Sequence, residues 1–145
     1  MNKLLMLLGR ICLSLIFVTS SITKLFTWDE TVQYMTTGLN HWLTATQFPG
    51  FMQQGIAYVN THTVLLLIIA TLFEGVGSLF VLLGFKVRMG ATLLIFFLAP
   101  VTIIMHSFWL LTGAERELQM IMFMKNLAML GGLFILAAKA GDTEG

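Results

Sequence analysis

The chain has 145 residues, of which 57% are hydrophobic and only 10% are charged, and eight Lys and Arg against seven Asp and Glu give a net charge of +1. An ordinary soluble domain carries roughly 25% charged residues, so the composition excludes a soluble enzyme. The near-neutral balance also excludes the basic surface that a nucleic-acid partner needs. What remains is an integral membrane protein, and the length allows a single domain, residues 1–145.

Four apolar runs predict an all-α, four-helix transmembrane bundle. They cover about residues 4–26, 63–84, 89–111 and 118–138, and roughly 20 apolar residues are needed to cross the hydrocarbon core as a helix. The first run follows Lys3 and so resembles a secretory signal as well. Arg10 within the run and its continuation to Phe26 favour a retained helix.

The charged residues outside these runs predict the orientation, because short loops rich in Lys and Arg stay in the cytoplasm. The basic residues that mark one side are Lys3, Lys86, Arg88 and Lys139. The acidic residues that mark the other side are Asp29, Glu30, Glu115 and Glu117. Both termini are therefore predicted to be cytoplasmic, in agreement with an even number of crossings.

The long outer loop, residues 27–62, has an amphipathic pattern. Thr27 and Glu30 have the spacing of a capping box. Apolar residues then recur at helical spacing, namely Trp28, Val32, Met35 and Leu39, and predict a short helix on the outer membrane surface. A second apolar cluster follows Pro49. Two interpretations remain open, a surface lid without chemistry and a gate over a pocket in the bundle.

Five ionisable residues fall inside the predicted spans: Arg10, Lys24, Glu74, His106 and Lys125. A charge at the bilayer centre costs at least about 2.5–3.5 kcal/mol, so such residues are usually paired or functional. Glu74 lies nearest the midplane and is predicted to be the hub. It would accept from Arg10 on the inner side, or from Lys125 and His106 on the outer side, while Lys24 would snorkel outward.

Three cations against one anion suggest that a further group satisfies the cluster. The candidates are a quinone carbonyl, a lipid phosphate or a small anion. The alternative is a polar network that only fixes helix register. No metal site is predicted, because Cys12 is the only cysteine and the sequence has no Cys-x-x-Cys or His-x-x-x-His pattern.

Several short segments, in this order, carry a resemblance to a known family: GR at 9–10, KLF at 24–26, TVQYM at 31–35, EGVG at 74–77, LGFKVR at 83–88, HSFW at 106–109 and MFMKNL at 122–127. The chain resembles the DoxX family of small four-helix inner-membrane proteins of bacteria. The resemblance implies a multi-pass protein of the bacterial inner (plasma) membrane, and the last segment adds Asn126 to the candidate ligand-binding residues. The connection from Gly38 to His62 looks longer than in many members.

The family is named for similarity to a membrane subunit of a thiosulfate:quinone oxidoreductase, which makes a quinone the candidate head group. We therefore expect an accessory membrane subunit of a quinone-linked oxidoreductase, with no covalently bound cofactor and no self-contained active site. A soluble redox protein and membrane lipid would be its partners, and the oligomeric state is left open. The alternatives are a non-catalytic scaffold or assembly factor, and a small-solute or anion pathway.

Overall fold

The computed structural model describes residues 2–45 and 48–144, and this part of the chain is almost entirely helical. No strand occurs within these described ranges. The helical segments in chain order are α1 (Asn2–Phe26), α2 (Trp28–Thr44), α3 (Gly50–Thr61), α4 (Thr63–Leu83), α5 (Val87–Met105), the 3-10 helix η1 (Phe108–Leu110) and α6 (Gly113–Glu144).

Four helical stretches are long and apolar enough to cross a membrane, which confirms the predicted all-α transmembrane fold. They are Lys3–Phe26, Thr63–Leu83, Val87–Leu110 and Gly113–Ala140. Three boundaries differ from the prediction by five residues or more, and one of them is the end of α6, which reaches Glu144 rather than residue 138. The third helix was expected to run to Leu111, but α5 ends at Met105 and only η1 follows, and the fourth begins at Gly113 rather than at Leu118.

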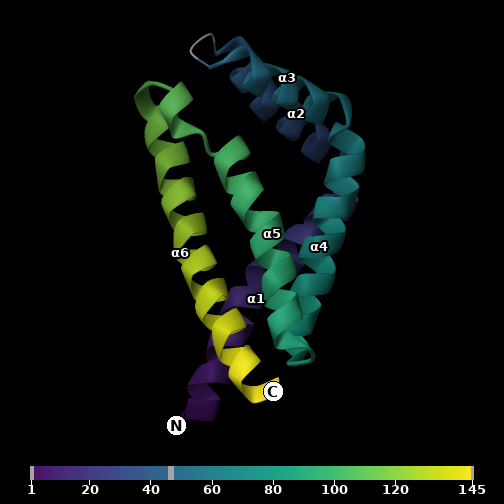
Figure 1. Cartoon of the computed structure of the whole chain (residues 1–145), viewed down its shortest axis with the longest axis vertical. Helices are drawn as coiled ribbons and strands as arrows, with labels where there is room; N and C mark the ends of the chain where they lie inside the picture. The colour runs from purple at the N-terminus through teal and green to yellow at the C-terminus, as the bar shows by residue number, and fades with distance from the viewer. Residues whose placement is uncertain (1, 46–47, 145) are drawn as a thin grey trace.

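The spans pack as a series in which each contacts the next. α4 packs against α1 and against α5, and α5 packs against α6, whereas α1 and α6 touch only sparsely. Their buried apolar side chains form one core that includes Phe17, Val81, Leu94 and Leu133. Both ends of the described chain lie at the bottom of Figure 1, and α2 and α3 lie across the top. Both termini are therefore at the same end of the bundle.

The turn between α4 and α5 depends on a left-handed backbone at Gly84, where φ is +75°. The Phe85 N–H donates to the Phe80 carbonyl at 3.1 Å, which is the six-to-one bond of a Schellman C-cap. Above this turn the two helices approach closely at Gly77 and Gly90. A Cβ added to Gly90 would lie 2.8 Å from the Gly77 carbonyl oxygen, so the crossing requires glycine.

The outer loop forms two helices, α2 and α3, that pack against the bundle. α2 contacts α4 and α5 and buries Leu39 and Trp42. The Trp42 indole N–H donates to the Ile104 carbonyl at 3.0 Å, and so satisfies an acceptor in the last turn of α5. The capping-box prediction is wrong, because the Thr27 hydroxyl donates to the Thr23 carbonyl instead of accepting from α2.

Replacing Gly90 should separate α4 from α5. We expect Gly90→Val to lower the free energy of unfolding by about 1–3 kcal/mol, because its side chain would overpack against backbone of α4. Thermal unfolding in mild detergent measures the change. Gly131→Val is the matched control, since Gly131 also lies in a membrane helix but has open space around its Cβ position. Equal losses in both variants would contradict the close crossing.

The basic residues at the end of the bundle that holds both chain termini predict that this end faces the cytoplasm. A reporter fused to the C-terminus should then read cytoplasmic. In a Cys12→Ser background, Gln54→Cys on the exposed side of α3 should react with a membrane-impermeant maleimide added outside spheroplasts. A periplasmic C-terminal reporter would show that the predicted orientation is inverted.

Candidate functional site

The centre of the candidate site is an ion pair between Lys24 of α1 and Glu74 of α4. Lys24 Nζ lies 2.5 Å from Glu74 Oε2, and the Glu74 side chain is only 1% exposed. The same ammonium donates to Ser20 Oγ at 2.9 Å and lies 4.9 Å from the centre of the Phe97 ring. The acceptors and the aromatic face together replace much of the hydration that a cation loses in the membrane.

Lys24 reaches Glu74 because α1 and α4 are displaced along their axes. Near the end of the bundle that holds both termini the Arg10 guanidinium lies against Gly84, and further from that end Ser21 lies against Gly75. Along this interface the carboxyl end of α1 meets the middle of α4. About eleven residues of α4 therefore extend beyond Lys24, which corresponds to roughly 16 Å of helix.

The expectation that Lys24 would snorkel outward is therefore wrong. Its side chain is 18% exposed and is held by Glu74. The expectation rested on counting residues from the end of each span, and this count assumes that neighbouring helices reach the same height. The displaced helix α1 violates that assumption.

A cavity of 410 Å³ adjoins the ion pair between the outer end of α1 and the first turns of α2. Each residue of its wall carries a polar group, and the wall consists of Ser20, Thr23, Lys24, Thr27, Glu30, Thr31 and Tyr34. This volume lies within the range of about 300–1,000 Å³ that is typical of small-molecule pockets. We call this cavity the Lys24 pocket.

The hydrogen bonds around the Lys24 pocket leave donors and acceptors free. The Lys24 ammonium has three N–H groups, and Glu74 and Ser20 account for two of them. The Thr27 and Thr31 hydroxyls donate to backbone carbonyls one turn earlier, which leaves their oxygens available as acceptors. The pocket can therefore donate one charge-assisted hydrogen bond from Lys24 to a ligand.

Arg10, predicted as an inner partner of Glu74, instead lies at the end of α4. A Cβ built on Gly84 would lie 2.6 Å from both terminal nitrogens of its guanidinium. This position places a cation at the carboxyl end of α4, where the helix dipole favours positive charge. Its buried Nε has no hydrogen-bond partner among the described residues. Arg10 therefore supports the α4–α5 turn and does not line the Lys24 pocket.

The other three candidates also lie apart from Glu74. His106 is the C-cap residue of α5, and its Nδ1 donates to Gln119 Oε1 of α6 at 2.7 Å, which joins these two helices. Lys125 is exposed, whereas Asn126 faces partly inward. The structure thus gathers Lys24 and Glu74 but not Arg10, His106, Lys125 or Asn126 into one polar cluster.

The residues that sequence analysis missed are the hydroxyls of the pocket wall. Ser20, Thr23, Thr27 and Thr31 follow one another at intervals of three or four residues. This is the spacing of one helix face, and it continues across the junction of α1 and α2. This spacing is visible in the sequence. The predicted first span ends at residue 26, however, and so separates Ser20 and Thr23 from Thr27 and Thr31.

No group of three or more His, Cys, Asp or Glu residues that could hold a metal ion occurs in the part of the chain that the structure describes. Cys12, the only cysteine of the sequence, is exposed on α1.

Comparison with known proteins gives two matches. The profile of the family described as DoxX matches residues 5–107. The chain is 31% identical over 136 residues to "Inner membrane protein YphA" of Escherichia coli (strain K12), an alignment that covers 94% of this chain and 83% of that protein. No solved structure matches. The residues matched by the family profile include Lys24 and Glu74 but end before α6.

Breaking the ion pair from one side should be more damaging than removing both charges. Lys24→Met and Glu74→Met should each cost about 3–5 kcal/mol, because each leaves a charged partner without its counter-ion. The double variant Lys24→Met/Glu74→Met should lose much less than the sum of the two single losses. Unfolding in detergent provides the double-mutant cycle.

Lys125→Met is the control for charge removal from a membrane span. Because Lys125 is exposed and the structure gives it no carboxylate partner among the described residues, this variant should unfold at or above the wild-type temperature. Additive losses from the Lys24 and Glu74 variants would contradict the coupling between them.

Proposed function

The chain belongs to the DoxX family and is a multi-pass inner-membrane protein, and from the geometry of the Lys24 pocket we propose that it is an accessory subunit that binds the carbonyl head group of a quinone. The observation that carries the proposal is the third N–H of Lys24. The ammonium lines the cavity while its other two donors hold Glu74 and Ser20. A carbonyl oxygen is the kind of acceptor that this donor lacks.

The charges around the pocket favour a neutral acceptor over an anion. Glu74 compensates the charge of Lys24, and Glu30 adds a further carboxylate to the pocket wall. An anionic ligand would meet a wall without a net positive charge. A quinone carbonyl, by contrast, needs a hydrogen-bond donor and no counter-ion, and the isoprenoid tail of a quinone suits a site within a membrane bundle.

In this proposal Glu74 is a positioning residue. It holds the Lys24 ammonium beside the pocket, as Ser20 does from one turn earlier on α1. His106 and Lys125, which sequence analysis considered as donors, have no place in it, because neither lines the Lys24 pocket. Electron transfer to or from a bound quinone requires a redox cofactor, so a soluble redox protein would be the partner.

A second function, that of a non-catalytic scaffold or assembly factor, is favoured by one observation. Glu74 is almost completely buried and its charge is fully matched by Lys24. Such a pair can fix the register of α1 against α4 without taking part in ligand binding. The two functions differ in whether a ligand occupies the Lys24 pocket.

Blocking the pocket without touching the ion pair distinguishes them. Thr23 lines the pocket, and Thr19 lies one turn earlier on the same helix, is also exposed, and does not line it. We expect Thr23→Trp to reduce the quinone that copurifies in mild detergent by about tenfold, which corresponds to about 1.4 kcal/mol, and Thr19→Trp to leave it unchanged. Mass spectrometry of extracted lipids gives the amount of quinone per protein.

Quinone content that is unchanged in Thr23→Trp would overturn the quinone site and leave the scaffold function. Both variants keep Lys24 and Glu74, so their unfolding temperatures should stay close to that of the wild type. A loss of quinone with normal folding therefore reports occupation of the pocket.

A further inference from the structure

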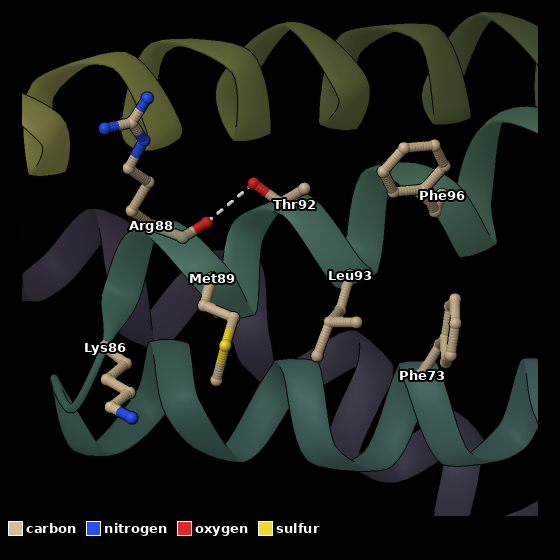
Figure 2. A pocket seen from close by; sticks show the side chains of 7 residues that line it. All are labelled: Phe73, Lys86, Arg88, Met89, Thr92, Leu93 and Phe96. Atoms are coloured by element: carbon tan, nitrogen blue, oxygen red, sulfur yellow. Dashed lines mark hydrogen bonds between the residues drawn. The ribbon is translucent and has the colours of Figure 1, made fainter.

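A second concave site lies at the opposite end of the bundle, on the membrane-facing side of α5. This groove has a volume of 730 Å³ and is lined by Phe73, Lys86, Arg88, Met89, Thr92, Leu93 and Phe96. It shares no residue with the Lys24 pocket. Figure 2 shows that α5 forms its floor, with α4 and α6 on either side. We call it the hairpin groove.

The polar and apolar residues of the hairpin groove are separated along its length. Lys86 and Arg88 lie at the end next to the α4–α5 turn, and the rings of Phe73 and Phe96 lie at the other end (Figure 2). Met89 and Leu93 point from α5 toward α4 between these ends. Arg88 and Phe96 are eight residues apart on α5, which corresponds to roughly 12 Å.

The cations at the charged end of the groove have no carboxylate partner among the side chains that the structure describes. Lys86 and Arg88 are exposed, and neither pairs with a carboxylate among the described residues. Lys86 Nζ lies 5.6 Å from the centre of the Phe85 ring, and the Arg10 guanidinium adds a third cation against Gly84 in the same turn. The described residues that line the groove include no acidic one. Its charged end therefore has a positive potential.

We propose that the hairpin groove binds an anionic phospholipid. Lys86 and Arg88, whose side chains extend toward opposite sides of the groove (Figure 2), attract its phosphate at the end next to the turn, and one acyl chain lies along Met89, Leu93 and Phe96 toward Phe73. The charge separation fits a phospholipid that enters from the membrane face at the α4–α5 turn, because its head group and tail are arranged in the same order. Basic sites between membrane helices are known to select anionic head groups.

Other ligands fit the groove less well. A free phosphate would satisfy the two cations but would leave the apolar length of the groove empty. A quinone would fill the apolar length but has no negative charge for Lys86 and Arg88. A zwitterionic phospholipid carries its own cation next to the phosphate, so it gains less from two further cations. Only an anionic phospholipid matches both ends.

Lipid selectivity tests the charged end. The full-length protein is placed in mixed micelles with equal amounts of phosphatidylglycerol and phosphatidylcholine that have the same acyl chains, and native mass spectrometry measures the ratio of the two bound lipids. The wild type should prefer phosphatidylglycerol, and Lys86→Gln/Arg88→Gln should reduce this preference by about 10- to 30-fold. Lys3→Gln/Lys139→Gln removes two exposed cations from the same end of the bundle but outside the groove, and should change the ratio less than about twofold.

The apolar end is tested by filling it. Met89→Trp should lower the bound phosphatidylglycerol, whereas Ile103→Trp, at an exposed position of α5 outside the groove, should not. An equal preference for both lipids in the wild type, an equal effect of the two charge variants, or full retention in Met89→Trp would each overturn the proposal. Because no lining residue is shared, these outcomes leave the quinone proposal at the Lys24 pocket unaffected.

Discussion

The arrangement of the bundle depends on the ion pair between Lys24 and Glu74. Either charge alone within a membrane span would cost several kcal/mol, and each compensates the other at 2.5 Å. The pair can form only at one displacement of α1 along α4, because Lys24 lies near the end of α1 and Glu74 lies near the middle of α4. A single polar contact thus selects the register between two helices whose other contacts are largely apolar and tolerant of sliding.

This register determines the structure of the outer half of the molecule. Since α1 ends at the level of Glu74, the outer part of α4 needs another neighbour, and α2 and α3 supply it. The carboxyl end of α5 also needs a neighbour, because the carbonyls of its last turn lack hydrogen-bond donors within the helix. Trp42 of α2 donates to one of them, the Ile104 carbonyl. The two interpretations of the outer loop, a lid and a gate, both place it over the bundle. Its packing on α4 and α5 agrees with both.

The sequence predicted the four spans, because hydropathy and length are local properties of each segment. It could not predict which charges meet, because this depends on displacement and rotation between helices. Neighbouring residues on a helix differ by about 100° in direction, so Asn126 faces partly inward while Lys125 is exposed. His106 was assigned to a continuous helix, but α5 ends at Met105 and turns the ring toward Gln119.

The two concave sites differ in charge, and this difference assigns them different ligands. At the Lys24 pocket the cation is matched by Glu74, and Glu30 makes the wall slightly acidic, so a neutral acceptor is favoured. At the hairpin groove no described carboxylate pairs with Lys86 or Arg88, so an anion is favoured. The same four helices can therefore hold a neutral head group near the outer end of α1 and an anionic lipid at the α4–α5 turn. Both sites adjoin α1, because Lys24 of this helix lines the first and Arg10 lies against Gly84 in the turn beside the second.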